Sequence, residues 1–245
     1  MVQKKKSPAG AVGGDTRRPV KAAASAPGQT EPPPPKKRGR PRAYQPEVAL
    51  AQAMDVFWKD GFAATSLDSL SAATGMNRPS LYGAFGDKRD IYMKAYKHYG
   101  ERARQRMAGI FAADLPLRAL LRSVYGLAIE MYLSGEDGPR GCFTVMTATS
   151  EAVFDPQLRG MVQTSLTEMD RFFARLFEAA MVKGELPKSA NSETLAQLAT
   201  ATIHTIAVRA RAGVPKKDLE AIANGAIGLI CGPDNDRVRD KRQKR

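Results

Sequence analysis

Residues 66–88 read SLDSLSAATGMNRPSLYGAFGDK and carry the strongest structural pattern in the chain. The pattern predicts two short helices, the first beginning at Thr65 or Ser66, both favoured N-cap residues, and ending at Gly75. The second begins at Asn77 and ends at Gly86. Their apolar positions are Leu67, Leu70, Ala73, Leu81 and Phe85. Two helices joined by a short glycine-containing turn are typical of the DNA-binding helix-turn-helix, although other helical hairpins also use glycine turns.

The predicted second helix carries polar side chains that core packing does not require. They are Asn77, Arg78, Ser80, Tyr82 and Lys88. Short or forked hydrogen-bond donors of this kind read base edges and contact phosphates in the grooves of DNA. The alternative is that Tyr82 and Lys88 are ordinary surface residues of a helical bundle.

The region from about residue 44 to 95 resembles the tetracycline-repressor (TetR) family of bacterial transcriptional regulators. The resemblance rests on Gly61-Phe62, Thr65-Ser66, Thr74-Gly75-Met76-Asn77, Leu81-Tyr82, Phe85 and Lys88. It implies a homodimer with two helix-turn-helix heads on a helical domain for ligand binding and dimerisation. It also implies that Tyr82 and Lys88 contact phosphates while Asn77, Arg78 and Ser80 face the groove. Two residues depart from the family pattern, Ala84 in place of a frequent His and Pro79 in place of a frequent Gly, which puts one phosphate contact in question.

The positive charge of the chain lies mainly at its N-terminus. The net charge is +13, and residues 1–42 carry 11 Lys and Arg against two acidic residues, whereas residues 44–92 carry four against six. The segment KKRGRPR at 36–42 resembles the core of an AT-hook, whose extended arm lies in a narrow A·T minor groove. We therefore expect Arg38, Arg40 and Arg42 to contact DNA, the alternative being an unstructured solubilising tail. The expected DNA-binding set is these three arginines with Ser66, Asn77, Arg78, Pro79, Ser80, Tyr82 and Lys88.

The rest of the sequence predicts an all-α protein, because helical periodicity continues from residue 43 to about 231 and hairpin signals are missing. The expected helices, apart from the two at 66–75 and 77–86, cover residues 46–60, 87–107, 115–134, 142–152, 155–183, 192–212 and 216–231. We expect a disordered, proline-rich tail at 1–43, a helix-turn-helix domain at 44–92, a ligand-binding and dimerisation domain at 93–232, and a charged tail at 233–245. The last two helices carry small and apolar residues, for example Ile206 and Ile227, and are expected to form the dimer contact.

An effector pocket in the helical body is implied by the resemblance alone. The candidate pocket residues are Met131, Phe143, Met146, Phe173, Phe177 and His204; such a stripe of methionines and aromatics is also typical of plain core. Cys142 is a candidate sensing thiol, because a predicted helix N-terminus and nearby Arg140 would favour the thiolate, the alternative being a buried inert thiol.

The sequence contains none of the motifs that an enzymatic function would require. The two histidines, His98 and His204, have no carboxylate or cysteine at metal-ligand spacing, and nucleotide-binding glycine loops and nucleophile elbows are missing. We therefore expect no enzymatic activity, no metal and no cofactor. Two cysteines and the lack of a long apolar stretch fit a cytoplasmic protein that is nucleoid-associated when bound to DNA.

The sequence thus predicts a DNA-binding transcriptional regulator, a repressor released by a small-molecule effector. Its expected partners are a double-stranded DNA operator, a second copy of itself and an unknown effector, with no membrane. The alternative function is an architectural protein that coats DNA with little sequence preference.

Overall fold

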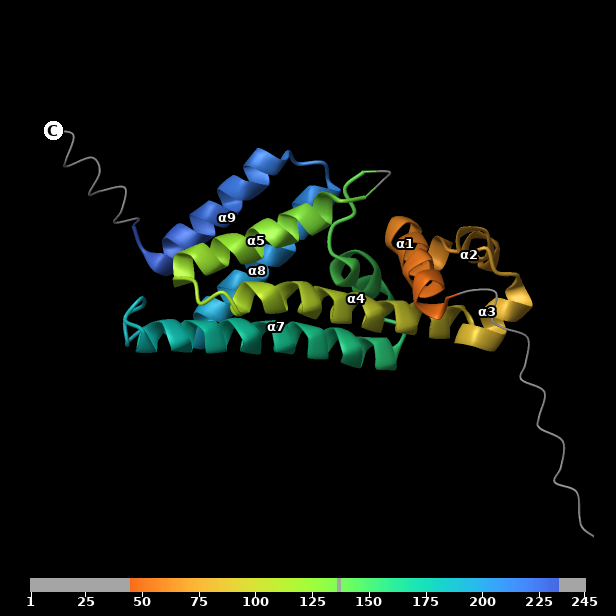
Figure 1. Ribbon diagram of the computed structural model, residues 1–245, viewed down its shortest axis with the longest axis horizontal. Helices are drawn as coiled ribbons and strands as arrows, with labels where there is room; N and C mark the ends of the chain where they lie inside the picture. Colours follow the sequence, from red (N-terminus) through yellow and green to blue (C-terminus); the bar gives the residue numbers. More distant parts are fainter. Residues whose placement is uncertain (1–44, 136–137, 234–245) are drawn as a thin grey trace, which may run out of the picture. The chain divides into compact units, whose positions relative to one another are not determined.

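All regular structure in the described part of the chain is helical. A computed structural model describes residues 45–135 and 138–233. The elements are α1 (Pro46–Ala64), α2 (Leu67–Thr74), α3 (Arg78–Phe85), α4 (Lys88–Phe111), α5 (Leu117–Leu133), the π-helical turn η1 (Thr144–Ala148), α6 (Thr149–Glu151), α7 (Pro156–Val182), α8 (Ser192–Arg211) and α9 (Lys216–Cys231) (Figure 1). The all-α prediction is confirmed. The expected arm residues Arg38, Arg40 and Arg42 lie outside the described residues.

Local capping explains where the helices of the predicted helix-turn-helix begin and end. Ser66, and not Thr65, is the N-cap of α2, and its hydroxyl accepts a hydrogen bond from the backbone N–H of Ser69 at 3.0 Å. Gly75 ends α2 in the left-handed conformation, with φ 64°. Asn77 then caps α3 by accepting from the backbone N–H of Ser80 at 2.9 Å. The turn between the two helices therefore follows from side chains within it.

The first three helices, which we call the head, pack through α1 on α4 and on η1. Phe57 is fully buried, and its ring lies edge-on to Tyr92 of α4, 5.1 Å between centroids. Phe143, just before η1, is also fully buried and lies 5.6 Å from the ring of Trp58 of α1. An aromatic cluster therefore joins the head to α4–α9, which we call the body.

The body is built from long helices around a second part of the core. Helix α7 packs along α8, α5 packs on both α8 and α9, and α8 packs on α9. Ile206 and Ile227 are buried inside the protomer. Their expected place in a dimer contact is therefore wrong, because neither side chain is available to a second copy.

Three predicted helices differ from the structure by more than two residues or in helix type. The first helix continues past Gly61 to Ala64, with a kink at Gly61 (φ 77°, ψ 171°), and α4 extends four residues beyond Met107. The helix expected at 142–152 is a π-helical turn followed by the short α6. The chain enters this turn through Gly141, where φ is +67° and a Cβ would lie 2.9 Å from the carbonyl oxygen of Ala207. Only glycine fits this close approach to α8 without strain.

Within the described ranges, no helix is both long enough and apolar enough to cross a membrane.

Candidate nucleic-acid interface

The predicted recognition helix α3 presents a polar face to solvent. Leu81 and Phe85 of this helix are buried, whereas Arg78, Ser80 and Tyr82 are exposed. Tyr82 keeps 47% of its surface accessible. Pro79 is exposed in the first turn, where a missing N–H costs no helical hydrogen bond. An eight-residue helix with one buried edge and one polar edge has the form of an element that enters the major groove.

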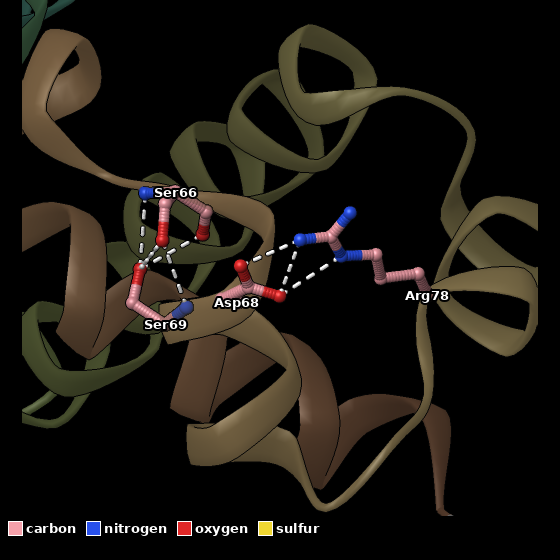
Figure 2. A network of polar contacts seen from close by, with 4 residues as sticks. All are labelled: Ser66, Asp68, Ser69 and Arg78. Atoms are coloured by element: carbon pink, nitrogen blue, oxygen red, sulfur yellow. Dashed lines mark hydrogen bonds and ion pairs between the residues drawn. The ribbon is translucent and has the colours of Figure 1, made fainter.

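Arg78 is bound by a carboxylate that the sequence interpretation did not include (Figure 2). Its guanidinium reaches from the start of α3 to Asp68 in the first turn of α2. The Nε atom donates to Oδ1 at 2.9 Å, and Nη2 donates to Oδ1 and Oδ2 at 2.5 Å each. The hydrogen bond to Asp68 raises the pKa of Arg78 further above its ordinary value. One edge of the guanidinium fork is thus held by Asp68, while the Nη1 edge makes no hydrogen bond within the described part of the chain.

Lys88 is held at the junction of α1 and α4. Its Nζ atom donates to the carbonyl oxygen of Ala63 at 3.3 Å and lies 4.5 Å from the ring centroid of Phe62. Lys88 is the first residue of α4, whose N-cap Asp87 accepts from the backbone N–H of Asp90 at 2.8 Å. The ammonium group therefore has a fixed position at a helix N-terminus, where anions bind favourably.

Two of the expected DNA contacts also have structural roles. The hydroxyl of Ser66 closes a reciprocal capping box with Ser69 (Figure 2), and the side-chain oxygen of Asn77 caps α3. The Ser66 hydroxyl also donates to the Oγ atom of Ser69 at 3.2 Å, so both its donor and one acceptor serve the cap. Asn77 uses only its side-chain oxygen, which leaves its NH2 group to donate to DNA.

Polar contacts between head and body were missed in the sequence. Arg89, next to Lys88, forms an ion pair with Asp155, the N-cap of α7, with 2.5 Å between Nε and Oδ2. The hydrogen bond from Arg89 lowers the pKa of Asp155 to about 2. Arg140, which follows α5, pairs with Asp55 of α1 at 2.8 Å. The partners are 66 and 85 residues apart, so local sequence patterns contain no signal for either pair.

The structure does not bring the six candidate pocket residues together around a cavity. Phe143, Phe173 and Phe177 are fully buried, with stacked rings 6.1 Å apart for the last two, and belong to the core. Met146 and His204 are partly buried, and burial lowers the pKa of His204. Met131 lines a cavity of about 190 Å³ between α1, α4 and α5. The sequence missed this cavity because its walls come from segments far apart in the chain.

Cys142 is buried behind tyrosine side chains. Its Sγ atom lies 3.4 Å from the hydroxyl oxygen of Tyr99, and burial raises the pKa of both Tyr99 and its neighbour Tyr132. Arg140, which was expected to act on the thiol, directs its guanidinium to Asp55 and over the ring of Trp58. The two reasons given for a thiolate, an α-helical N-terminus and this cation, are therefore not met by the observed geometry; a sensing role for Cys142 stays a prediction.

Comparison with known proteins places this arrangement in a family. One family model, "Bacterial regulatory proteins, tetR family", matches residues 49–94, and another, "Tetracyclin repressor-like, C-terminal domain", matches residues 117–225. A cysteine mutant of the TetR family transcriptional regulator CifR, complexed with 26-bp double-strand operator DNA, superposes with a TM-score of 0.69 and 30% identity over 77% of this chain and 98% of that chain. The chain belongs to the TetR family.

Two curated relatives of this TetR family member come from Escherichia coli K12. The HTH-type transcriptional repressor ComR is 28% identical over 195 residues, which are 79% of this chain and 92% of ComR. The HTH-type transcriptional repressor BdcR is 34% identical over 121 residues, which are 49% of this chain and 59% of BdcR. The protein is thus a helix-turn-helix transcriptional regulator. Because the TetR family consists of regulatory proteins, the prediction that this chain is not an enzyme is confirmed.

Proposed function

We propose that the protein is a dimeric repressor that binds a double-stranded DNA operator through α3 and is released by a small-molecule effector. The observation that carries the proposal is the exposed polar face of α3, with the guanidinium of Arg78 held at one edge by Asp68. CifR, whose structure contains operator DNA, supports it as a relative, as do the repressors ComR and BdcR. Such a repressor acts on the bacterial chromosome and hence in the cytoplasm.

We assign the DNA contacts by chemistry. Arg78 and Ser80 face the base edges, because a forked donor reads guanine and a hydroxyl accepts or donates. Tyr82 and Lys88 contact phosphates on either side of the groove, since one is an exposed phenol and the other a fixed ammonium group. Ser66, Asn77 and Pro79 line the same surface.

The proposed domain organisation follows the same assignment. Residues 44–92 form the DNA-binding domain, which carries more acidic than basic residues. The arm within residues 1–43 supplies the missing phosphate affinity, with the AT-hook-like segment in the adjacent minor groove. Residues 93–232 form the ligand-binding and dimerisation domain, and residues 233–245 a charged tail.

The dimer forms through the outer faces of α8 and α9. Leu198 and Val208 of α8 are 39% and 50% exposed, and Leu229 of α9 is 78% exposed. Ala201 and Gly225 are exposed on the same two helices, and small residues allow close approach of helices from a second copy around a two-fold axis. Replacement of Leu198 and Leu229 by Asp is expected to give monomers in sedimentation and to abolish tight operator binding. Dimers that persist in this variant would refute the assignment.

Sequence competition tests the operator function against the alternative of a DNA-coating protein. The full chain is used to capture genomic fragments, and the recovered sequences are compared with the input. A repressor enriches a short, two-fold related sequence and discriminates it from random DNA at every salt concentration. A coating protein enriches nothing and loses affinity for all sequences alike as salt rises.

A further inference from the structure

A cleft of about 190 Å³ lies where the head meets the body. Its walls come from α1, α4 and α5, together with Ser134 and Arg140 beyond the end of α5. The charged and aromatic lining residues are Asp55, Trp58, Tyr99, Arg102, Arg106 and Arg140. A cavity of about 150 Å³ holds a benzene molecule, so this cleft has room for one aromatic ring with a small substituent.

The charge of the cleft is unbalanced. Arg102 and Arg106 are four residues apart on α4 and therefore lie on one face of that helix. Among the described residues, neither guanidinium has an acidic partner, whereas the guanidinium of Arg140 is paired with Asp55 at 2.8 Å. Three cations thus face one carboxylate, which favours an anion.

The remaining walls suit an aromatic group. The rings of Trp58 and Tyr99 meet edge to face, 5.1 Å between centroids, and the side chains of Met54 and Met131 also line the cleft. The indole Nε1 atom of Trp58 donates to the carbonyl oxygen of Arg140 at 3.1 Å, which fixes the orientation of this ring. Aromatic and thioether groups contact aromatic ligands favourably.

We propose that this cleft binds a small aromatic carboxylate, with the carboxylate on Arg102 and Arg106 and the ring against Trp58 and the two methionines. The same carboxylate also attracts the guanidinium of Arg140, which lines the cleft, and therefore competes with Asp55 for it; that competition weakens a polar contact between α1 and the body. The effect of such binding on DNA release rests on the proposed repressor function. The binding itself does not, since it is measured without DNA.

Trp58 is the only tryptophan in the chain and reports directly on the cleft. The full chain is titrated with benzoate, and with benzamide as a neutral compound of similar shape, by tryptophan fluorescence and by calorimetry at low salt. Benzoate is expected to bind saturably in the millimolar range or below, and benzamide is not. Equal binding of the two compounds, or of inorganic phosphate as tightly as benzoate, would overturn the proposal, as would a complete lack of saturable binding.

Single substitutions locate the site. Arg102→Gln and Arg106→Gln should each weaken benzoate binding about tenfold or more, because each removes a charged hydrogen-bond donor. Arg104→Gln is the matched control, since Arg104 lies on the same helix but outside the cleft, 3.9 Å from Glu168. Asp55→Asn should strengthen binding by releasing Arg140. A loss in Arg104→Gln equal to that in the cleft variants would show that α4 attracts anions without a site.

Release of DNA is then measured separately. Benzoate is expected to lower operator affinity in the wild type, and about tenfold more benzoate or above should be needed for the same effect in Arg106→Gln. A chain that binds benzoate but no operator would refute the repressor function and leave the cleft assignment intact. A chain that binds operator but no benzoate would refute the cleft assignment and leave the repressor function intact.

Discussion

Replacement of Asp68 by Asn tests whether this carboxylate orients Arg78 for DNA recognition. The amide keeps the shape of the side chain but loses the negative charge. It also replaces one of the two carboxylate oxygens that accept from Nε and Nη2 of Arg78 at 2.5–2.9 Å. The two side chains are 55% and 73% exposed, for Arg78 and Asp68 respectively. Because solvated pairs contribute little to folding, thermal stability should hardly change.

The effect on DNA binding follows from the released cation. Once Asp68 no longer holds it, the guanidinium of Arg78 can pair with any phosphate nearby. One additional phosphate contact steepens the slope of log K against log salt by about 0.9, which corresponds to about fivefold tighter binding at about 0.15 M salt than at 1 M. Because phosphate contacts contribute little at about 1 M salt, we take the variant and the wild type to bind random DNA equally there. At about 0.15 M the variant should then bind random DNA about fivefold tighter than the wild type, while its operator affinity gains less because the fork has lost its orientation. The preference for operator over random DNA should fall.

Fluorescence anisotropy with labelled operator and random duplexes at several salt concentrations measures both the salt slope and the preference for operator over random DNA. Glu47→Gln is the matched control, since Glu47 is an exposed acid in the first turn of α1 and its replacement also removes one negative charge from the head. An unchanged salt slope in Asp68→Asn, or an identical change in Glu47→Gln, would refute the positioning role of Asp68.

Three further predictions concern the head and its connections. Arg78→Ala should lower the discrimination between the right and the wrong base by roughly 5- to 150-fold at about one position per half-site, whereas Lys88→Ala should lower the affinity for all sequences alike. A Lys88 variant with altered base preference would reverse the two roles. The carboxyl of Asp155 should titrate by NMR near pH 2 and, in Arg89→Gln, at a higher pH that is still below its ordinary value, because the backbone N–H groups of Gln157 and Leu158 keep donating to it; the ion pair stabilises the fold above about pH 4 and is lost as pH falls towards 2, and a titration that does not move in Arg89→Gln would show that Arg89 does not hold the carboxyl. Deletion of residues 1–42 should flatten the salt slope by several units and cost most affinity on operators with A·T flanks; an unchanged slope would make the arm a solubilising tail.

The sequence predicted those parts of the fold that depend on local chemistry. Asn77 caps α3 as predicted, Ser66 is the one of the two candidates that caps α2, and Gly75 and Gly86 end α2 and α3 where the pattern placed them. The π-helical turn at 144–148 was not predicted, because it depends on contacts such as that of Thr147 with Tyr92, 55 residues away.

The candidate site also divides into features that local sequence predicts and features that depend on contacts between distant segments. The exposed face of α3 follows from helical periodicity around Leu81 and Phe85, so its polar residues could be named in advance. The carboxylates that hold the arginines could not, because Asp55 and Asp155 meet Arg140 and Arg89 only in the packed structure. The structure places Phe143, Phe173 and Phe177 in the core for a related reason: large apolar side chains at helical spacing are buried in a core whether or not a cavity adjoins them.

The affinity ratio between a selected operator and random DNA tests most directly whether α3 reads sequence. The full chain is titrated against both duplexes at about 0.15 M salt, with the operator taken from the enriched genomic fragments. A repressor of this kind should bind the operator at least about a thousandfold tighter than random DNA, and Arg78→Ala should lower that ratio. A ratio near one that stays the same in Arg78→Ala would contradict sequence recognition by α3 and identify a protein that coats DNA.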